Sequence, residues 1–167
     1  MDGNRRLHFQ KDRKCLLLNL FTSRYTSAFP GCAVTWYPFT AHPEADSCWA
    51  VSTGPDGRVY AAACCEGLPG GTAKVMRYNR GTDSLDCLFD IAEVTGDPPE
   101  SGRATQCKIH YGFAPSPGDG ILYMASHLSG PPIDRPTYSP WYSWHDRQRC
   151  FRGSALVAFD TGADRIL

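Results

Sequence analysis

From residue 47 onward, short apolar runs alternate with clusters of Gly, Pro, Asn and Asp. The runs are rich in residue types that suit a pleated sheet, and the clusters between them are typical of turns. No stretch shows the 3.6-residue spacing of an amphipathic helix. The pattern predicts an all-β fold, in which the first strands are Cys48 to Ser52, Arg58 to Cys65, Ala73 to Tyr78 and Ser84 to Phe89.

The pattern repeats along the chain. Residues 56–60, DGRVY, recur 63 positions later as DGILY, and residues 75–83, VMRYNRGTD, recur 81 positions later as LVAFDTGAD. The difference of 18 positions places an insertion between the second and third strands of the second unit. Four antiparallel strands per repeating unit are typical of a β-propeller blade, in which each sheet buries its faces against its neighbours.

The repeated segments DGRVY, DGILY, MRYNRGTD and VAFDTGAD resemble the blades of quinoprotein-like and lactonase-like propellers. This resemblance implies a partial β-propeller with two recognisable four-stranded blades, the second incomplete. The first blade covers residues 47–90, and the second covers 91–167 with a long insertion at 129–152. Propellers have more blades than two, so we expect either a fragment of a longer protein or self-association that completes the ring.

Residues 1–46 are predicted to be a leader or part of a preceding blade. Basic residues precede the apolar run Cys15 to Phe21, which faintly resembles a signal peptide, but Asn19 interrupts that short run. The eight cysteines include no CxxC pair, which disfavours a zinc site. Cysteines within apolar strands are more typical of reduced thiols and favour the cytoplasm, whereas the even number permits disulfides after export. The sequence leaves the localisation open.

Charge narrows the class of partner. The chain has 17 basic and 17 acidic residues, so it has no net charge to attract nucleic acid or an anionic membrane. No apolar run approaches the ~20 residues of a membrane-spanning helix. We therefore expect neither nucleic acid nor a membrane as partner. The acidic residues between the blades predict a solvated loop, with a calcium site as the alternative: Asp90, Glu93, Asp97 and Glu100.

A predicted hairpin in the second blade carries the candidate chemistry. Its strands are Cys107 to Phe113 and Ile121 to His127, around a loop from Pro115 to Gly120. If Phe113 faces Leu122, the numbers of paired residues sum to about 235. The same register brings three polar side chains to one end of the hairpin: Lys108, His110 and His127.

These three side chains are the candidate catalytic residues. Histidine exchanges protons near neutral pH, and a neighbouring lysine stabilises an anion or lowers the pKa of the histidine. The structural alternative is that His110 is a strand histidine, His127 a capping side chain and Lys108 a solvated one. In the first blade the position of His127 is occupied by Cys64, so the histidine is not part of the repeat.

The insertion supplies candidate binding residues. It follows His127 closely, and its aromatic side chains suit stacking on sugar rings while its arginines suit a carboxylate or sulfate. Long loops of this kind are often functional, although the aromatics can instead form a cluster that pins the loop. The candidate residues are Arg135, Tyr138, Trp141, Tyr142, Trp144 and Arg147.

A histidine pair on a blade hairpin, with tyrosine and arginine nearby, resembles propeller-fold polysaccharide lyases such as the ulvan lyases. The resemblance implies β-elimination on a uronate-containing glycan, with His110 as base or acid, His127 as its partner and Lys108 as a carboxylate contact. The expected partner is thus a carbohydrate or another small molecule. The alternative is a non-catalytic propeller that binds a protein or a glycan through the aromatic loop. No cofactor is identified from the sequence, and no metal site is predicted.

Overall fold

The structure is a computed structural model that describes residues 26–29, 32–127, 130–134 and 146–167. The chain divides into two units, residues 1–36 and 37–167. The described part of the first unit is an antiparallel hairpin of β1 (Thr26–Phe29) and β2 (Cys32–Thr35). The second unit contains the two sheets and the candidate site.

The first of these sheets consists of four consecutive antiparallel strands, as the sequence predicts. Each strand boundary lies within one residue of its predicted position. In spatial order the strands are β3 (Ser47–Thr53), β4 (Val59–Cys64), β5 (Ala73–Asn79) and β6 (Ser84–Asp90).

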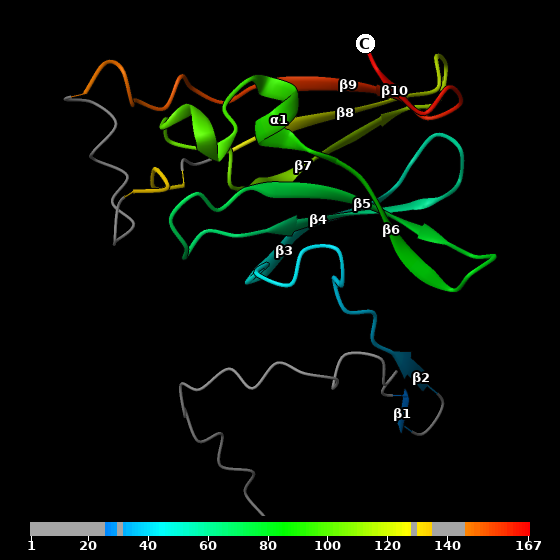
Figure 1. The fold of residues 1–167 in the computed structure, drawn as a ribbon. Helices are drawn as coiled ribbons and strands as arrows, with labels where there is room; N and C mark the ends of the chain where they lie inside the picture. The colour runs from blue at the N-terminus through cyan, green and yellow to red at the C-terminus, as the bar shows by residue number, and fades with distance from the viewer. Residues whose placement is uncertain (1–25, 30–31, 128–129, 135–145) are drawn as a thin grey trace, which may run out of the picture. The chain divides into compact units, whose positions relative to one another are not determined.

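The second sheet repeats this arrangement, and Figure 1 shows the two sheets as neighbouring layers. Its last strand is only two residues long, and the predicted insertion separates its second and third strands. In spatial order the strands are β7 (Ile109–Ser116), β8 (Ile121–Ser126), β9 (Leu156–Asp160) and β10 (Arg165–Ile166).

The sheets share one pairing register between their second and third strands. The positions that the sequence repeat aligns are paired in the same way in both sheets. The pairs Ala61–Met76 and Ala62–Val75 in the first sheet correspond to Met124–Val157 and Ala125–Leu156 in the second.

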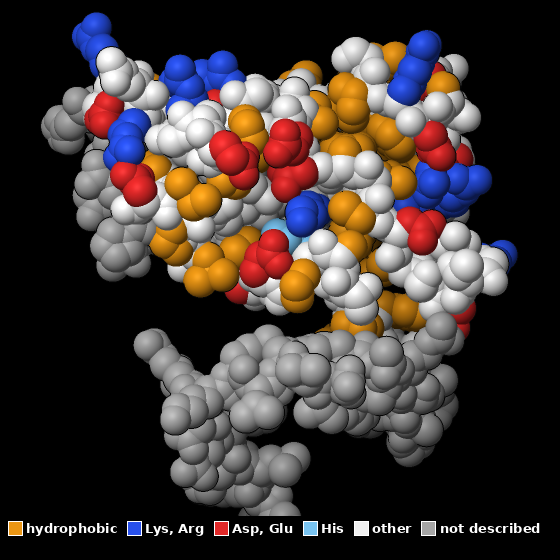
Figure 2. Space-filling view, in the orientation of Figure 1, with side chains coloured by type: hydrophobic (Ala, Val, Ile, Leu, Met, Phe, Trp, Pro, Cys, Tyr) orange, Lys and Arg blue, Asp and Glu red, His pale blue; other side chains and the backbone are white. Residues whose placement is uncertain are grey.

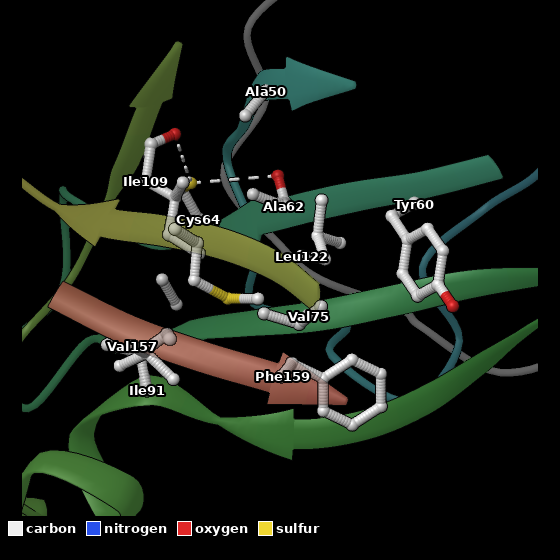
Figure 3. Packing of buried hydrophobic residues seen from close by; sticks show 12 residues of the cluster. Ala50, Tyr60, Ala62, Cys64, Val75, Ile91, Ile109, Leu122, Val157 and Phe159 are labelled. Atoms are coloured by element: carbon white, nitrogen blue, oxygen red, sulfur yellow. Dashed lines mark hydrogen bonds between the residues drawn. The ribbon is translucent and has the colours of Figure 1, made fainter. Parts of the chain in front are cut away.

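One buried apolar cluster joins the two sheets (Figure 3). Fully burying a side chain of the size of Leu or Phe contributes about 1.5–3 kcal/mol, so this contact is a main source of stability. The first sheet contributes Tyr60, Ala62, Cys64 and Val75, and the second contributes Leu122, Met124, Val157 and Phe159. The described residues of the second unit thus form a mostly β fold of two packed sheets, neither of which closes on itself.

The other face of the first sheet is also covered. Ala61, Ala63 and Met76 form a small apolar cluster there, and Phe39 and Ala45 pack against it. Residues 37–46, which precede β3, therefore act as a cover for this face.

A short helix, α1 (Ile91–Thr95), follows β6 and was not predicted. The Asp90 side chain caps it by accepting a hydrogen bond of 2.8 Å from the Ala92 amide, and Gly96 ends it with φ 75°. A 3₁₀ turn, Pro99–Ser101, follows. The prediction of a solvated acidic loop is wrong for Asp97, which is buried and bonded to Arg152 and Gln106.

The loop predicted from Pro115 to Gly120 is shorter than expected. Strand β7 continues through Ser116, and Pro115 pairs with Leu122. Strand β7 is an edge strand of its sheet, and an edge strand tolerates proline because one side makes no ladder hydrogen bonds. Asp56 and Asp119 cap the equivalent turns as predicted, accepting hydrogen bonds from the amides of Arg58 and Ile121.

Candidate functional site

Strand β7 carries a bulge that forms the centre of the candidate site. Ile109 pairs with Ser126, and the next pair along the strands is Phe113 with Met124, so three residues lie opposite Ala125 alone. These residues are His110, Tyr111 and Gly112. Bulges redirect side chains and are common beside active sites.

The bulge changes the predicted register on one side only. The prediction that Phe113 faces Leu122 is wrong, since the bulge shifts the pairing by two residues. On the other side of the bulge the predicted register is correct: Ile109 pairs with Ser126, and their residue numbers sum to 235 as expected. The His127 amide donates a hydrogen bond of 2.8 Å to the Lys108 carbonyl, which confirms that these two residues are neighbours.

Backbone conformation in the bulge is unusual. Tyr111 has φ 54°, a left-handed value that costs a bulky L-residue about 1–3 kcal/mol. Gly112 passes so close to β8 that a Cβ there would lie 2.7 Å from the Ala125 carbonyl oxygen. The glycine is needed for this close approach, and the Tyr111 side chain is presented to solvent with 78% of its surface exposed.

The first strand of the other sheet, β3, is bulged at the corresponding place. Cys48 pairs with Ala63 and Val51 with Ala61, so Trp49 and Ala50 lie opposite one residue. Ala50 is buried in the cluster between the sheets, whereas the Trp49 side chain is 39% exposed. The two bulges together place Trp49 beside the β7 rings.

We name the four neighbouring rings, Trp49, His110, Tyr111 and His127, the ring cluster. The His110 ring centroid lies 5.0 Å from Trp49, 4.2 Å from Tyr111 and 5.3 Å from His127. The sequence prediction that His110 and His127 meet is confirmed by this distance. His127 is exposed and His110 is half-buried, so the cluster is accessible to a ligand.

Lys108 lies beneath the rings. Its ammonium nitrogen is 3.1 Å from each carboxylate oxygen of Glu66 and 3.8 Å from the centre of the Trp49 ring. The Lys108 side chain is only 8% exposed, and Trp49 donates its indole hydrogen bond to the same carboxylate. Lys108 is therefore held in place by Glu66 and Trp49. The same contacts fix the tryptophan side chain, and they leave the lysine charge already paired.

The electrostatics of the ring cluster favour a neutral His110. The pKa of His110 is lowered from its ordinary value of 6.5 by desolvation first, then by the positive charges of Lys108 and His127, while Glu66 opposes the shift. A histidine with a lowered pKa is unprotonated at neutral pH. His110 can thus accept a proton, and the exposed Tyr111 hydroxyl and His127 imidazole are neighbouring groups that can donate one.

Most of the predicted binding residues lie outside the described residues: Arg135, Tyr138, Trp141, Tyr142 and Trp144. Arg147 is described and exposed. The described ends of the insertion are held by Arg149, which pairs with Asp134 at 2.7 Å, and by Arg152, which pairs with buried Asp97 at 2.8 Å. The base of the insertion is therefore anchored to the segment between the sheets.

The described residues hold no group of three or more side chains that could bind a metal ion. Cys64 and Cys65 are buried, and burial raises the pKa of each of these two thiols to about 11. Thiols with raised pKa values are poor nucleophiles, so they offer no competing chemistry. No helix in the described ranges is both long and apolar enough to cross a membrane.

A cleft lies at the end of the first sheet away from the ring cluster. This cleft has a volume of about 740 Å³, and the Arg77–Asp164 ion pair lies in its wall. Basic and acidic side chains alternate around it, and they are also interspersed over the face drawn in Figure 2. None of the predicted site residues lines this cleft.

Sequence reasoning missed Trp49, Glu66 and Tyr111. Trp49 and Glu66 reach the site from the first sheet, and no local pattern shows that contact. Tyr111 is adjacent to His110, and the Tyr-Gly pair at 111–112 inside a strand was an available signal for a bulge.

Searches against protein-family models, curated proteins and solved structures find no match to this chain. The resemblances to propellers and lyases accordingly remain predictions from the sequence.

Proposed function

We propose that the chain is part of a β-propeller protein that acts on a carbohydrate at the ring cluster, by β-elimination at a uronate residue. The observation that carries the proposal is the close grouping of His110, His127 and Tyr111, with the pKa of His110 lowered. A base, two candidate acids and a flat indole ring within reach of one another suit proton transfer on a sugar.

The propeller assignment is supported by how the two sheets stack. Each has four antiparallel strands in chain order, and repeat-equivalent residues are paired alike. The face of the second sheet that packs on the first carries Met124 and Val157, and the equivalent face of the first sheet carries Ala61 and Met76. In a propeller, likewise, every blade presents the same one of its two faces to the blade before it.

In the proposed reaction, His110 removes the proton from the carbon beside the uronate carboxyl group. The electron pair of that C–H bond forms a carbon–carbon double bond, and the bond to the neighbouring glycosidic oxygen breaks. The leaving oxygen takes a proton from Tyr111 or His127. Trp49 would stack on a sugar ring next to the reacting one.

Lys108 takes no direct part in this reaction, because Glu66 and Trp49 already hold its ammonium group. Its effect is to keep the pKa of His110 low. The contact to the substrate carboxylate is left to an arginine, for which exposed Arg147 is the described candidate.

The test is a turnover assay on a panel of uronate-containing polysaccharides. The conjugated double bond of the product absorbs ultraviolet light, so product formation is followed directly. We expect activity in the unmodified chain and none with His110→Gln, and we expect Arg80→Gln, at the far end of the first sheet, to leave activity unchanged. Unchanged turnover with His110→Gln would remove the basis for the enzyme.

A non-catalytic binding module is the second candidate. The observation that favours it is the exposure of Tyr111 and Trp49, beside a lysine whose charge is fully paired. Exposed aromatic rings on an ordered support are a common binding surface for glycans and proteins. In that case Trp49→Ala weakens glycan binding in calorimetry, and no substrate on the panel gives product.

A further inference from the structure

Each sheet has two kinds of face, and the sequence repeat identifies them. The front face carries Met124 and Val157 in the second sheet and their repeat equivalents, Ala61 and Met76, in the first. The opposite face of each sheet is its back face. Its aligned residues are Tyr60, Ala62 and Val75 in the first sheet and Tyr123, Ala125 and Leu156 in the second. Where the sheets pack together, the back face of the first meets the front face of the second.

The front face of the first sheet is occupied by a segment of the chain itself. Residues 37–46, which we name the cover, contribute Phe39 and Ala45 to a small cluster with Ala61, Ala63 and Met76. By the packing seen between the two sheets, this is the face that fits the back face of another sheet. The cover therefore lies where a neighbouring sheet would stack.

The cover also reproduces one contact of a neighbouring sheet. The repeat aligns Tyr78 of the first sheet with Phe159 of the second. The Phe159 ring meets Tyr60, on the back face of the first sheet, edge-on with 6.3 Å between ring centroids. The Tyr78 ring meets Tyr37 of the cover edge-on with 5.3 Å between centroids. Tyr37 thus takes the place on the first sheet that Tyr60 takes on the second.

Polar contacts anchor the cover to the first sheet. The Tyr37 hydroxyl donates a hydrogen bond of 2.7 Å to Asp83, and Nε2 of the buried His42 lies 3.1 Å from the Thr72 carbonyl oxygen. On its solvent side the cover exposes a carboxylate, Glu44. It therefore replaces an apolar sheet face by a polar surface, as the terminal caps of repeat proteins do.

The back face of the second sheet is the surface that matches the covered one. Leu156 is 74% exposed there, and Ala125 is exposed as well. If the cover opened, the front face of one copy could meet the back face of the next. Such a contact joins two different surfaces and repeats from copy to copy.

We propose that residues 37–46 are an autoinhibitory cover, which keeps the front face of the first sheet from binding the back face of the second sheet of another copy. The cover and a partner sheet compete for one surface, so head-to-tail stacking requires the cover to open. The proposal rests on the sequence repeat and on the packing of the two sheets. It does not depend on the chemistry of the ring cluster, so its failure would leave the proposed reaction standing.

The first test loosens the cover in the full chain and measures mass by sedimentation equilibrium over a range of concentrations. We expect the unmodified chain to have the mass of one copy. Phe39→Ala combined with His42→Ala removes two anchors and should raise the apparent association constant by roughly a hundredfold, about tenfold for each anchor, because the open state becomes more populated. Thr40→Ala, at an exposed position of the cover, is the matched control and should keep the mass of one copy.

The second test shows which faces meet. Leu156→Asp places a carboxylate on the back face, and an unpaired carboxylate is costly to bury, so adding it to the loosened chain should restore the mass of one copy. This triple variant keeps an open front face, and the unmodified chain keeps a free back face. A mixture of the two should therefore form a one-to-one complex, although each alone has the mass of one copy.

A loosened chain that keeps the mass of one copy at every concentration overturns the proposal, and so does an unmodified chain that assembles. Assembly that survives Leu156→Asp, or a mixture that forms no complex, shows that these two faces do not meet and overturns it as well. Circular dichroism checks that each variant is folded. His42→Ala alone is the milder variant if the double variant does not fold, and the same outcomes apply to it.

Discussion

The first strands of the two sheets, β3 and β7, are both bulged, yet the bulges hold different residues. In β3 the bulge buries Ala50 between the sheets and leaves Trp49 at the surface. In β7 the longer bulge places the His110 ring against that tryptophan and leaves Tyr111 exposed beside His110. The same position in the repeat thus contributes to packing in one sheet and presents polar rings in the other.

The residues at the ends of the second strands, β4 and β8, differ in the same way: one is buried and the other is exposed. Cys64, at the end of β4, is fully buried between the sheets, and its thiol donates to the Ala62 carbonyl (Figure 3). His127, at the equivalent position of the second sheet, is exposed beside His110. The imidazole of His127 therefore lies where the second sheet departs from the repeated sequence. The residues that follow the repeat pack the two sheets together.

The largest effect is expected from breaking the ion pair that ties the two sheets together at the ring cluster. Glu66→Ala leaves Lys108 buried without a counter-ion and should lower the free energy of unfolding by about 3 kcal/mol, the lower end for a broken buried pair because Glu66 is 23% exposed. Urea denaturation measures the change. Asp134→Ala, which breaks an exposed pair with Arg149, should lower the free energy of unfolding far less, and equal losses would contradict the assigned burial.

A smaller effect is expected from filling the space at the β7 bulge. Gly112→Ala places a methyl group against the Ala125 carbonyl and should cost about 2 kcal/mol in thermal denaturation. Gly118→Ala, in the turn with no atom nearby, is the control and should change little. If both variants melt alike, the close approach at the bulge is wrong.

Exchanging the equivalent residues of the two sheets tests their different roles. Cys64→His forces an imidazole into the packed interface and should cost about 1.5 kcal/mol. His127→Cys, at an exposed site, should leave stability within about 0.5 kcal/mol of the original while reducing turnover or glycan binding. The reverse order of the two stability effects would contradict the assigned faces.

The smallest effect is expected at Tyr111. Tyr111→Gly removes a bulky residue from a left-handed backbone conformation, so stability should stay level or rise by up to about 1 kcal/mol. Activity or binding at the ring cluster should nevertheless fall. A clear loss of stability instead would show that the Tyr111 ring packs for the fold.

The repeat made much of the fold predictable. The DG turns and the strands after them follow from local turn chemistry and β-propensity, which act over a few residues. The short helix α1 was not predicted, because five residues are too few to show a helical spacing of apolar positions. Asp90 and Gly96, which flank it, are nevertheless typical helix-capping residues. A propeller needs further sheets that complete a ring, and the described residues do not include such sheets.

The site was predicted only in part. His110 and His127 meet because they lie on one hairpin, where register links sequence to space. The errors come from the bulge, which moved Phe113 by two positions, and from tertiary contact, which brought Glu66 to Lys108. A lysine that looks solvated in a strand sequence proved buried because its partner follows a strand of the other sheet.

Acid should destabilise the folded chain through His110. Because its pKa is lowered on folding, the folded state binds its proton less readily than the unfolded state does. The stability that His110 contributes is therefore present above the unfolded pKa of about 6.5 and is lost as pH falls through the lower folded pKa. The urea midpoint of His110→Gln should depend less on pH in this range than that of the unmodified chain.

The most direct measurement is an NMR titration of the His110 imidazole in the unmodified chain and in Lys108→Met. A neutral base at the ring cluster requires a pKa below 6.5 in the unmodified chain, and removal of the lysine charge should raise it. A His110 pKa at or above 6.5, or one that Lys108→Met leaves unchanged, would contradict the role assigned to the cluster.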